Sequence, residues 1–205
     1  MSALEPIRTV RGRAVVLPGD DIDTDRIIPA RFLKCVTFDA LGPQLFYDER
    51  FAEDGTPKAH PLNAPEAEGA TILVSGQNFG SGSSREHAPQ SIHKAGFRAL
   101  VAGSFAEIFF GNATTLGMPC VTLDPEDLGV LQAQLRAAPE TIVEVDVAAR
   151  EVRAGERVFP AHLPDGAHGA LVEGRWDPLG DLLEAADDAV ALADRLGYAG
   201  VRSAG

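Results

Sequence analysis

Residues 78–89 combine side chains and glycines that could bind and transform a small anion, in the order Asn-Phe-Gly-Ser-Gly-Ser-Ser-Arg-Glu-His-Ala-Pro. Gly80 and Gly82 let the backbone turn tightly and approach a ligand closely, and the guanidinium fork of Arg85 matches a carboxylate. Free N–H groups at the start of the following helix would offer partial positive charge to an anion. The combination predicts a site for a small carboxylate substrate.

Two alternative roles for this segment need no carboxylate. Ser83 and Glu86 have the spacing of a capping box, whose side chains only satisfy the first N–H groups of a helix, and spacing alone does not separate this role from a substrate site. A dinucleotide or phosphate loop is the second alternative. Arg85 occupies the place of the third glycine of that motif, and no ribose-binding acid follows the next strand at Gly103. We therefore discount a nucleotide site.

The elements around the segment would hold it at the edge of a sheet. Residues 70–74 form a short apolar run that predicts a buried strand, and a helix is expected over 84–94, with Gly96 as its C-terminal stop. The serine-rich segment therefore follows the carboxyl end of a strand. Ligands bind at that edge in open α/β sheets.

The same alternation of strand and helix continues along the chain. Residues 97–102 and 118–123 are predicted as strands. The helix between them is expected to begin at Ser104, whose spacing to Glu107 matches a capping box, and to end at Gly117. Short connections of this kind favour parallel pairing with right-handed crossovers.

The remaining segments extend this α/β layer. Residues 12–17 predict an opening strand, and 27–65 predict long loops with short helices. Alternating apolar and polar residues over 141–147 and a turn-centred pair of short strands within 151–159 predict antiparallel β structure. Residues 178–197 have the spacing of an amphipathic helix. We expect an α/β fold with a parallel βαβαβ layer plus antiparallel strands, and one domain over the whole of 1–205.

The net charge and the lack of long apolar runs argue against nucleic acid and membranes as partners. The formal net charge is -12, with 30 acidic against 18 basic residues, which opposes binding to a phosphate backbone. Residues 1–6 contain no apolar stretch that could act as a signal peptide, and no later window has the uninterrupted apolar run of a membrane span. We expect a soluble, cytoplasmic protein that binds neither nucleic acid nor membrane.

The residue types that hold metals do not form a metal motif. Cys35 and Cys120 are the two cysteines of the chain, and neither belongs to a Cys-x-x-Cys pattern. Asp21, Asp23 and Asp25 have the spacing of the start of a calcium loop, but the turn glycine and the final glutamate of that loop are missing. We expect no metal bound by this chain, and we expect His87 to be a structural hydrogen bonder.

Three ordered motifs resemble the swivelling domain of the aconitase superfamily, particularly the small subunits of 3-isopropylmalate dehydratase. The first is residues 78–89, the second is Asp-Ile-Asp-Thr-Asp-Arg-Ile-Ile-Pro-Ala at 21–30, and the third is Ser-Phe-Ala-Glu-Ile-Phe-Phe-Gly-Asn at 104–112. The resemblance covers about residues 11–160. It departs from the family at Ser81, where cysteine is common, and becomes weaker beyond residue 160.

The resemblance implies a hydro-lyase that is active only with a second chain. It implies a swivelling β/β/α domain that closes over a large subunit carrying a [4Fe-4S] cluster, in a heterodimer or heterotetramer. Together the two chains would interconvert 2-isopropylmalate and 3-isopropylmalate through isopropylmaleate in leucine biosynthesis. It assigns the catalytic base to Ser83, and assigns substrate binding or support to four further residues: Ser84, Arg85, Thr24 and Asp25.

Substrate preference is expected to depend on one loop, residues 31–34. The resemblance assigns it to four loop residues, Arg31, Phe32, Leu33 and Lys34. Phe32 and Leu33 could pack against an isopropyl group, while Arg31 or Lys34 could meet the distal carboxylate of a longer substrate. Alternatively, all four are ordinary loop anchors. Two other functions stay open: a homoaconitase or methylmalate-type small subunit, and a stand-alone anion-binding module.

Overall fold

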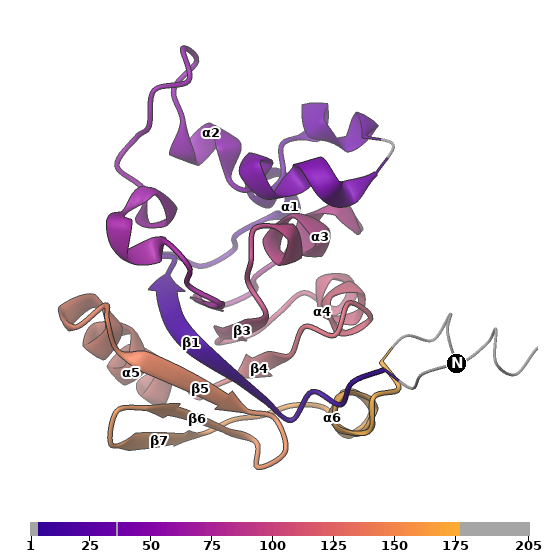
Figure 1. The fold of residues 1–205 in the computed structure, drawn as a ribbon, viewed down its shortest axis with the longest axis vertical. Coiled ribbons are helices and arrows are strands. Elements are labelled where there is room, and N and C mark those ends of the chain that lie inside the picture. The colour runs from indigo at the N-terminus through magenta and orange to yellow at the C-terminus, as the bar shows by residue number, and fades with distance from the viewer. Residues whose placement is uncertain (1–3, 36, 177–205) are drawn as a thin grey trace, which may run out of the picture.

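A computed structural model describes residues 4–35 and 37–176, whose strands form one mixed sheet (Figure 1). The strand order is β4-β3-β2-β1-β5-β6-β7. The strands are β1 (Thr9–Val16), β2 (Ile72–Val74), β3 (Ala99–Ala102), β4 (Cys120–Thr122), β5 (Ile142–Asp146), β6 (Glu151–Ala154) and β7 (Arg157–Pro160).

The first four strands are parallel. Ala14 of β1 pairs with Ile72 of β2, Ile72 pairs with Ala99 of β3, and Leu100 pairs with Cys120 of β4. Every residue of β2 and β3 is buried, because helices and loops cover both faces of a parallel sheet and its strands are therefore apolar throughout. The predicted parallel βαβαβ layer is confirmed.

The last three strands are antiparallel and extend the sheet from β1. Thr9 of β1 pairs with Asp146 of β5, and β5, β6 and β7 follow as neighbours. The turn between β6 and β7 contains Gly155 at φ +60, a left-handed conformation that glycine adopts without strain. The predicted antiparallel structure is confirmed, and β1 joins the two parts of the sheet.

Helices cover both faces of the parallel strands (Figure 1). One face packs against α3 (His87–Lys94) and α4 (Glu107–Thr114), and the other packs against α5 (Pro125–Ala137). The shorter elements are α1 (Thr24–Ile27), η1 (Ala30–Lys34), η2 (Phe38–Gln44), α2 (Tyr47–Arg50), η3 (Pro61–Asn63), η4 (Pro65–Ala67) and α6 (Asp165–Glu173). The prediction of loops and short helices over 27–65 is thus confirmed.

Alternate residues of the parallel strands enter two separate cores. Leu73 and Leu100 face the core beneath α3 and α4, while Ile72 and Val101 face the core that includes Leu131 of α5. Successive side chains of a strand point to opposite faces, so each strand contributes to both cores. This packing fixes the strand ends from which the loops of the site begin.

Neither serine with capping-box spacing caps a helix, so the cap predicted at Ser104 is wrong and the capping alternative for Ser83 is not seen. Helix α3 begins at His87 rather than Ser84; its N-cap residue is Glu86, and no side chain caps it. Helix α4 begins at Glu107, with Ala106 as N-cap and again no side-chain cap. The hydroxyl of Ser104 instead accepts a hydrogen bond from the backbone N–H of Asn78. In both cases the serine lies in the loop before the helix.

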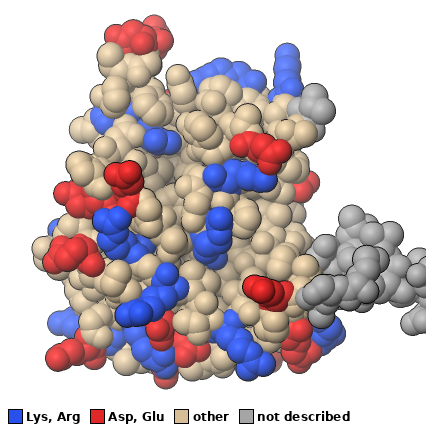
Figure 2. Space-filling model, in the orientation of Figure 1, with Lys and Arg blue, Asp and Glu red and all other residues tan. Residues whose placement is uncertain are grey.

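Other differences concern elements that we did not predict from the sequence or placed with other bounds. Helices α5 and α6 were not predicted, and β1 begins at Thr9 rather than at residue 12. The predicted helix over 178–197 lies outside the described residues. Within the described part of the chain, no helix has the length and apolar character needed to cross a membrane. On the face drawn in Figure 2, basic and acidic side chains are interspersed rather than gathered into patches of one sign.

Candidate functional site

Two of the sequence motifs, about sixty residues apart, are joined by backbone hydrogen bonds. The N–H of Thr24 donates to the carbonyl of Ser81 at 2.8 Å, and the N–H of Gly80 donates to the carbonyl of Ile22 at 2.7 Å. Asp23 and Ser81 also form a parallel bridge. The fold therefore brings the Thr24–Asp25 pair beside the serine loop, which we define as residues 80–85.

Thr24 makes the most intimate of these contacts. Its side chain is only 2% exposed, and its hydroxyl donates to the carbonyl oxygen of Ser83 at 3.1 Å. Gly82, at φ +98, lies against this hydroxyl, and a Cβ there would lie 3.2 Å from Oγ1 of Thr24. The glycine thus permits both the left-handed turn and the close approach.

Replacing Thr24 by valine is expected to lower the free energy of unfolding by about 1 kcal/mol, because valine has a similar shape but donates no hydrogen bond to Ser83. Thr24→Ser, which keeps the hydroxyl, should lose less. Urea unfolding of the three proteins measures the difference. Equal stability of the valine variant and the parent would show that this bond contributes nothing.

The third motif, residues 104–112, packs against the residue that precedes the serine loop. Phe79 is fully buried, and its ring packs edge-to-face against Phe109 of α4 at 5.2 Å between centroids. Gly80 follows it at φ +80, where a Cβ would lie 2.2 Å from Cγ of Phe109. Helix α4 and the serine loop therefore pack so closely that only glycine fits at position 80.

The polar groups at the end of the loop are left available. Ser83 and Ser84 are exposed, and within the described part of the chain neither hydroxyl makes a hydrogen bond. The backbone N–H groups of Ser83, Ser84 and Arg85 also donate no hydrogen bond to any described residue. These hydroxyl and N–H groups, which come just before α3, can therefore receive an anionic ligand.

Arg85 and Asp25 form an ion pair across the two motifs. The Arg85 side chain is 21% exposed and that of Asp25 is 59% exposed. Ion pairs with this much solvent contribute only about 0–1 kcal/mol to stability. The contact matters more for orientation, because it holds the Arg85 guanidinium against Asp25, the neighbour of Thr24 in the chain.

The predicted specificity residues form the helical turn η1, and Arg31 is already engaged there. Its Nη1 donates to Asp48 at 2.8 Å, and its guanidinium lies over the ring of Phe32 at 4.5 Å. The hydrogen bonds with Asp48 raise the pKa of Arg31 and lower that of the Asp48 carboxyl. Phe32 and Leu33 are half-buried against the core, and Lys34 is exposed.

His87 lies in the first turn of α3, where its ring packs edge-to-face on Phe38 at 5.1 Å between centroids. This contact links α3 to η2. An ion pair between Lys94 and Asp39 joins the same two elements at 2.6 Å. The position of His87 suits the structural role that we expect for it.

The cysteines do not fit an iron–sulfur cluster. Such clusters are held by several thiolates. Burial raises the pKa of the Cys120 thiol well above its ordinary value, which keeps it protonated, and Cys35 is the only other cysteine. Among the described residues, no three His, Cys, Asp or Glu side chains are grouped so that they could hold a metal ion.

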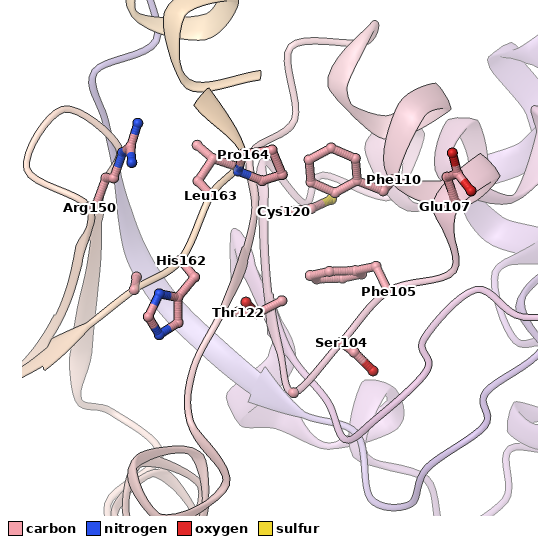
Figure 3. A pocket seen from close by; sticks show the side chains of 12 residues that line it. Ser104, Phe105, Glu107, Phe110, Cys120, Thr122, Arg150, His162, Leu163 and Pro164 are labelled. Atoms are coloured by element: carbon pink, nitrogen blue, oxygen red, sulfur yellow. The ribbon is translucent and has the colours of Figure 1, made fainter. Parts of the chain in front are cut away.

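A pocket of about 620 Å³ opens next to residues 76–79, which we call the root of the serine loop (Figure 3). Its walls come from the carboxyl ends of β3 and β4, the start of α4, and the segment before α6. Its lining includes Ser104, Phe105, Thr122, Arg150 and His162. None of the predicted site residues lines it, so this pocket is separate from the place where the two motifs meet.

The root of the loop is held by residues that the sequence motifs did not single out. Oδ1 of Asp20 accepts a hydrogen bond from the N–H of Gln77 at 2.6 Å, and a Cβ on Gly76 would lie 2.0 Å from the same oxygen. The sequence signal that could have pointed to Asp20 was its residue type, because Asp side chains bond readily to nearby backbone in turns. Its partner Gln77, however, lies 57 residues away along the chain.

Comparisons with known proteins agree with these motifs. Residues 4–126 match the family described as the aconitase C-terminal domain. The chain is 60% identical over 184 residues to a 3-isopropylmalate dehydratase small subunit of Thermus thermophilus, which covers 90% of this chain and 92% of that protein. It is 46% identical over 195 residues to the protein of that name from Synechocystis sp., covering 95% and 96%.

A solved structure shares the fold as well as the sequence pattern. The crystal structure of 3-isopropylmalate dehydratase from Methanocaldococcus jannaschii superposes with a TM-score of 0.63 at 26% identity, covering 87% of this chain and 99% of that chain. The resemblance predicted from three motifs is therefore confirmed. The chain belongs to the aconitase C-terminal domain family and, within it, to the family of 3-isopropylmalate dehydratase small subunits.

Proposed function

We propose that this chain is the small subunit of a dehydratase that interconverts 2-isopropylmalate and 3-isopropylmalate through isopropylmaleate in leucine biosynthesis. The observation that carries the proposal is the meeting of the Thr24–Asp25 pair with a serine loop whose Ser83 hydroxyl remains unbonded within the described residues. The curated relatives that match along most of the chain have the corresponding name.

The chain acts with a large subunit, in a heterodimer or heterotetramer. We assign a [4Fe-4S] cluster to that partner, since the cysteines of this chain do not fit one. A bound cluster with an open iron site supplies Lewis-acid chemistry toward a leaving hydroxyl. We also propose that the whole chain is one swivelling domain that works in the cytoplasm.

Ser83 is the base in this proposal. Its oxygen takes the proton from the substrate carbon during dehydration and returns a proton to carbon during rehydration. Serine is a weak acid, so the alkoxide needs preorganised stabilisation. The N–H groups of Ser84 and Arg85 donate to no described residue, and they supply part of that stabilisation.

The neighbouring residues bind and orient the substrate. Nη1 of Arg85 is bound to Asp25, which holds the guanidinium in place, while its Nε and Nη2 make no hydrogen bond to any described residue and offer two parallel donors to a substrate carboxylate. Thr24 fixes the backbone of Ser83 through its hydroxyl. Ser84 supplies a second exposed hydroxyl beside the base. Each of these residues contributes a different part of one small anion site.

The state of Arg31 favours a substrate with an apolar side chain. Asp48 neutralises this arginine, and the rings of Phe32 and Tyr47 lie beneath its guanidinium. A distal carboxylate of homoaconitate would have to compete with Asp48, whereas an isopropyl group needs only the apolar surface of Phe32 and Leu33. This supports isopropylmalate over the homoaconitase alternative.

Asp48→Asn is expected to raise the ratio of kcat/KM for homoaconitate to kcat/KM for isopropylmaleate by about tenfold, since a freed arginine gains roughly one charge-assisted hydrogen bond. Hydration rates of the two substrates by the reconstituted complex measure the ratio. Asp48→Glu, which keeps the ion pair, is the matched control. An unchanged ratio in Asp48→Asn would remove Arg31 from substrate selection.

The function itself is tested by purifying the tagged chain anaerobically from its native host, so that a cluster-bearing partner accompanies it. Hydration of isopropylmaleate by material that contains an iron-bearing second chain would support the dehydratase. Faster hydration of homoaconitate or a methyl-substituted analogue would move the assignment to those substrates. Binding of small dicarboxylates without a partner and without turnover would favour the stand-alone anion-binding module.

A further inference from the structure

We infer that Asn78, held between Asp21 and Ser104, is a positioning residue that aims the serine loop at the substrate. The inference rests on the proposed function and adds residues to which that function assigns no role. Asn78 belongs to the root of the loop, residues 76–79, and lies five positions before Ser83. It touches neither the base nor Arg85 in any described hydrogen bond.

On one side, Asn78 is tied to the segment that follows β1. Its side-chain Nδ2 donates to Oδ1 of Asp21 at 2.7 Å, and the N–H of Asp21 donates to the carbonyl of Gln77 at 2.9 Å. Both residues have left-handed backbone, with φ +54 at Asn78 and φ +52 at Asp21. Such values are uncommon outside glycine, and Asn and Asp tolerate them best.

On the other side, Asn78 is tied to the segment that follows β3. Its backbone N–H donates to the Ser104 hydroxyl oxygen at 2.7 Å, and the N–H of Phe79 donates to the Ser104 carbonyl at 3.0 Å. In Figure 3 the Ser104 hydroxyl points away from the other labelled side chains of the pocket. The bond to the N–H of Asn78 accounts for this direction.

These bonds connect the root to both neighbours of its own strand. Strand β2 lies between β1 and β3, and Asn78 bonds to the residues that leave each of them. Asp21, Gln77 and Asn78 are exposed, so their bonds compete with water and add little to overall stability. Their effect is directional, because they fix the path of the chain just before it turns at Gly80 and Gly82.

Direction matters at this point because proton transfer depends steeply on distance. A displacement of about 1 Å can lower a reaction rate by about 100-fold. Thr24 holds the far end of the loop at the carbonyl of Ser83, and Asn78 holds its near end. Without the Asn78 carboxamide, the loop would keep its backbone bonds to Ile22 and Ser104 but lose the side-chain bond that fixes Asn78 against Asp21.

Asn78→Gly tests the inference, because glycine accepts a positive φ freely and the substitution removes the side chain that bonds to Asp21 while leaving the backbone N–H that bonds to Ser104. In the complex reconstituted with its large subunit, kcat for isopropylmalate should fall about 30-fold while KM changes less than about threefold. The melting temperature should stay close to that of the parent. The deuterium isotope effect on kcat, with substrate labelled at the proton-donating carbon, should increase because proton transfer becomes slower.

Conservative variants separate positioning from general damage. Asp21→Asn keeps an acceptor oxygen for Asn78 and should retain near-parent kcat, whereas Asp21→Ala should resemble Asn78→Gly. Asn63→Gly is the control in another part of the fold. The carboxamide of Asn63 donates to two backbone carbonyls, at 2.7 Å to that of Arg50 and at 3.1 Å to that of Lys58, whereas the carboxamide of Asn78 donates to the Asp21 carboxylate. Asn63→Gly should change the melting temperature without changing the isotope effect.

Parent-like kcat and isotope effect in Asn78→Gly, in a complex whose parent is active, would overturn the inference and leave the proposed function intact. A fall in kcat that merely follows a loss of folded protein would also overturn it. An inactive parent complex would overturn the proposed function and the inference together. The activity of the parent therefore distinguishes the two failures.

Discussion

Ser83→Ala is expected to lower kcat of the reconstituted dehydratase about 1000-fold, because it removes the group that accepts the proton from carbon. KM should change far less, since the N–H groups and Arg85 that bind the substrate remain. The melting temperature should stay near that of the parent, because Ser83 is exposed and does not cap α3. Steady-state kinetics with an intact cluster, measured beside thermal unfolding, tests both parts.

Ser81→Ala is the matched control for this substitution. It removes a hydroxyl two residues away in the same loop and leaves the backbone bond from Thr24 in place. Its kcat should stay within a few-fold of the parent. Near-normal turnover in Ser83→Ala would instead remove the proposed base. A capping role for Ser83 would show as a loss of about 1 kcal/mol in stability with unchanged turnover.

Phe79→Ala is expected to cost about 3–5 kcal/mol of the free energy of unfolding, the range for truncating a buried aromatic side chain. Phe79 is fully buried, and its ring packs against those of Phe105 and Phe109 at 6.2 and 5.2 Å between centroids. Denaturant unfolding of the isolated chain measures the loss. A single domain has only about 5–15 kcal/mol in total, so the variant should also unfold at a much lower temperature.

Two control variants test whether the loss of stability comes from the buried volume of Phe79. Phe79→Leu keeps most of the apolar volume and should lose clearly less than the alanine variant. Val158→Ala removes a side chain that is 53% exposed and should stay within about 0.5 kcal/mol of the parent. A loss below about 1 kcal/mol in Phe79→Ala would contradict the packing of α4 beneath the serine loop.

Local patterns were sufficient for the strands of the sheet. The apolar run at 70–74 and the alternation at 141–147 each predicted a strand that the structure contains, as β2 and β5. The continuous run marks β2 because both of its faces are buried, and the alternation marks β5 because successive side chains of a strand point to opposite faces. The three ordered motifs were likewise sufficient to recognise the family.

The starts of α3 and α4 were predicted less well than the strands. Helix α5 was not predicted, although its sequence signals are present. Helix α5 has Pro125 in its first turn, followed by Glu126 and Asp127, and buries Leu128, Leu131 and Leu135. This is the usual pattern of a helix start and an amphipathic face. The sequence therefore contains enough information to predict α5 without any tertiary contact.

By itself, the sequence determined the strands, the α/β class, the family and the residue types of the candidate site. Only the tertiary structure decided how the serines are used: Ser83 and Ser104 both have capping-box spacing, yet neither caps a helix. A cap contributes about 1 kcal/mol, which partners distant in sequence can outweigh. Ser104 bonds to Asn78, and Thr24 holds Ser83 from 59 residues away. Those partners become neighbours only when β1, β2 and β3 pair in the sheet.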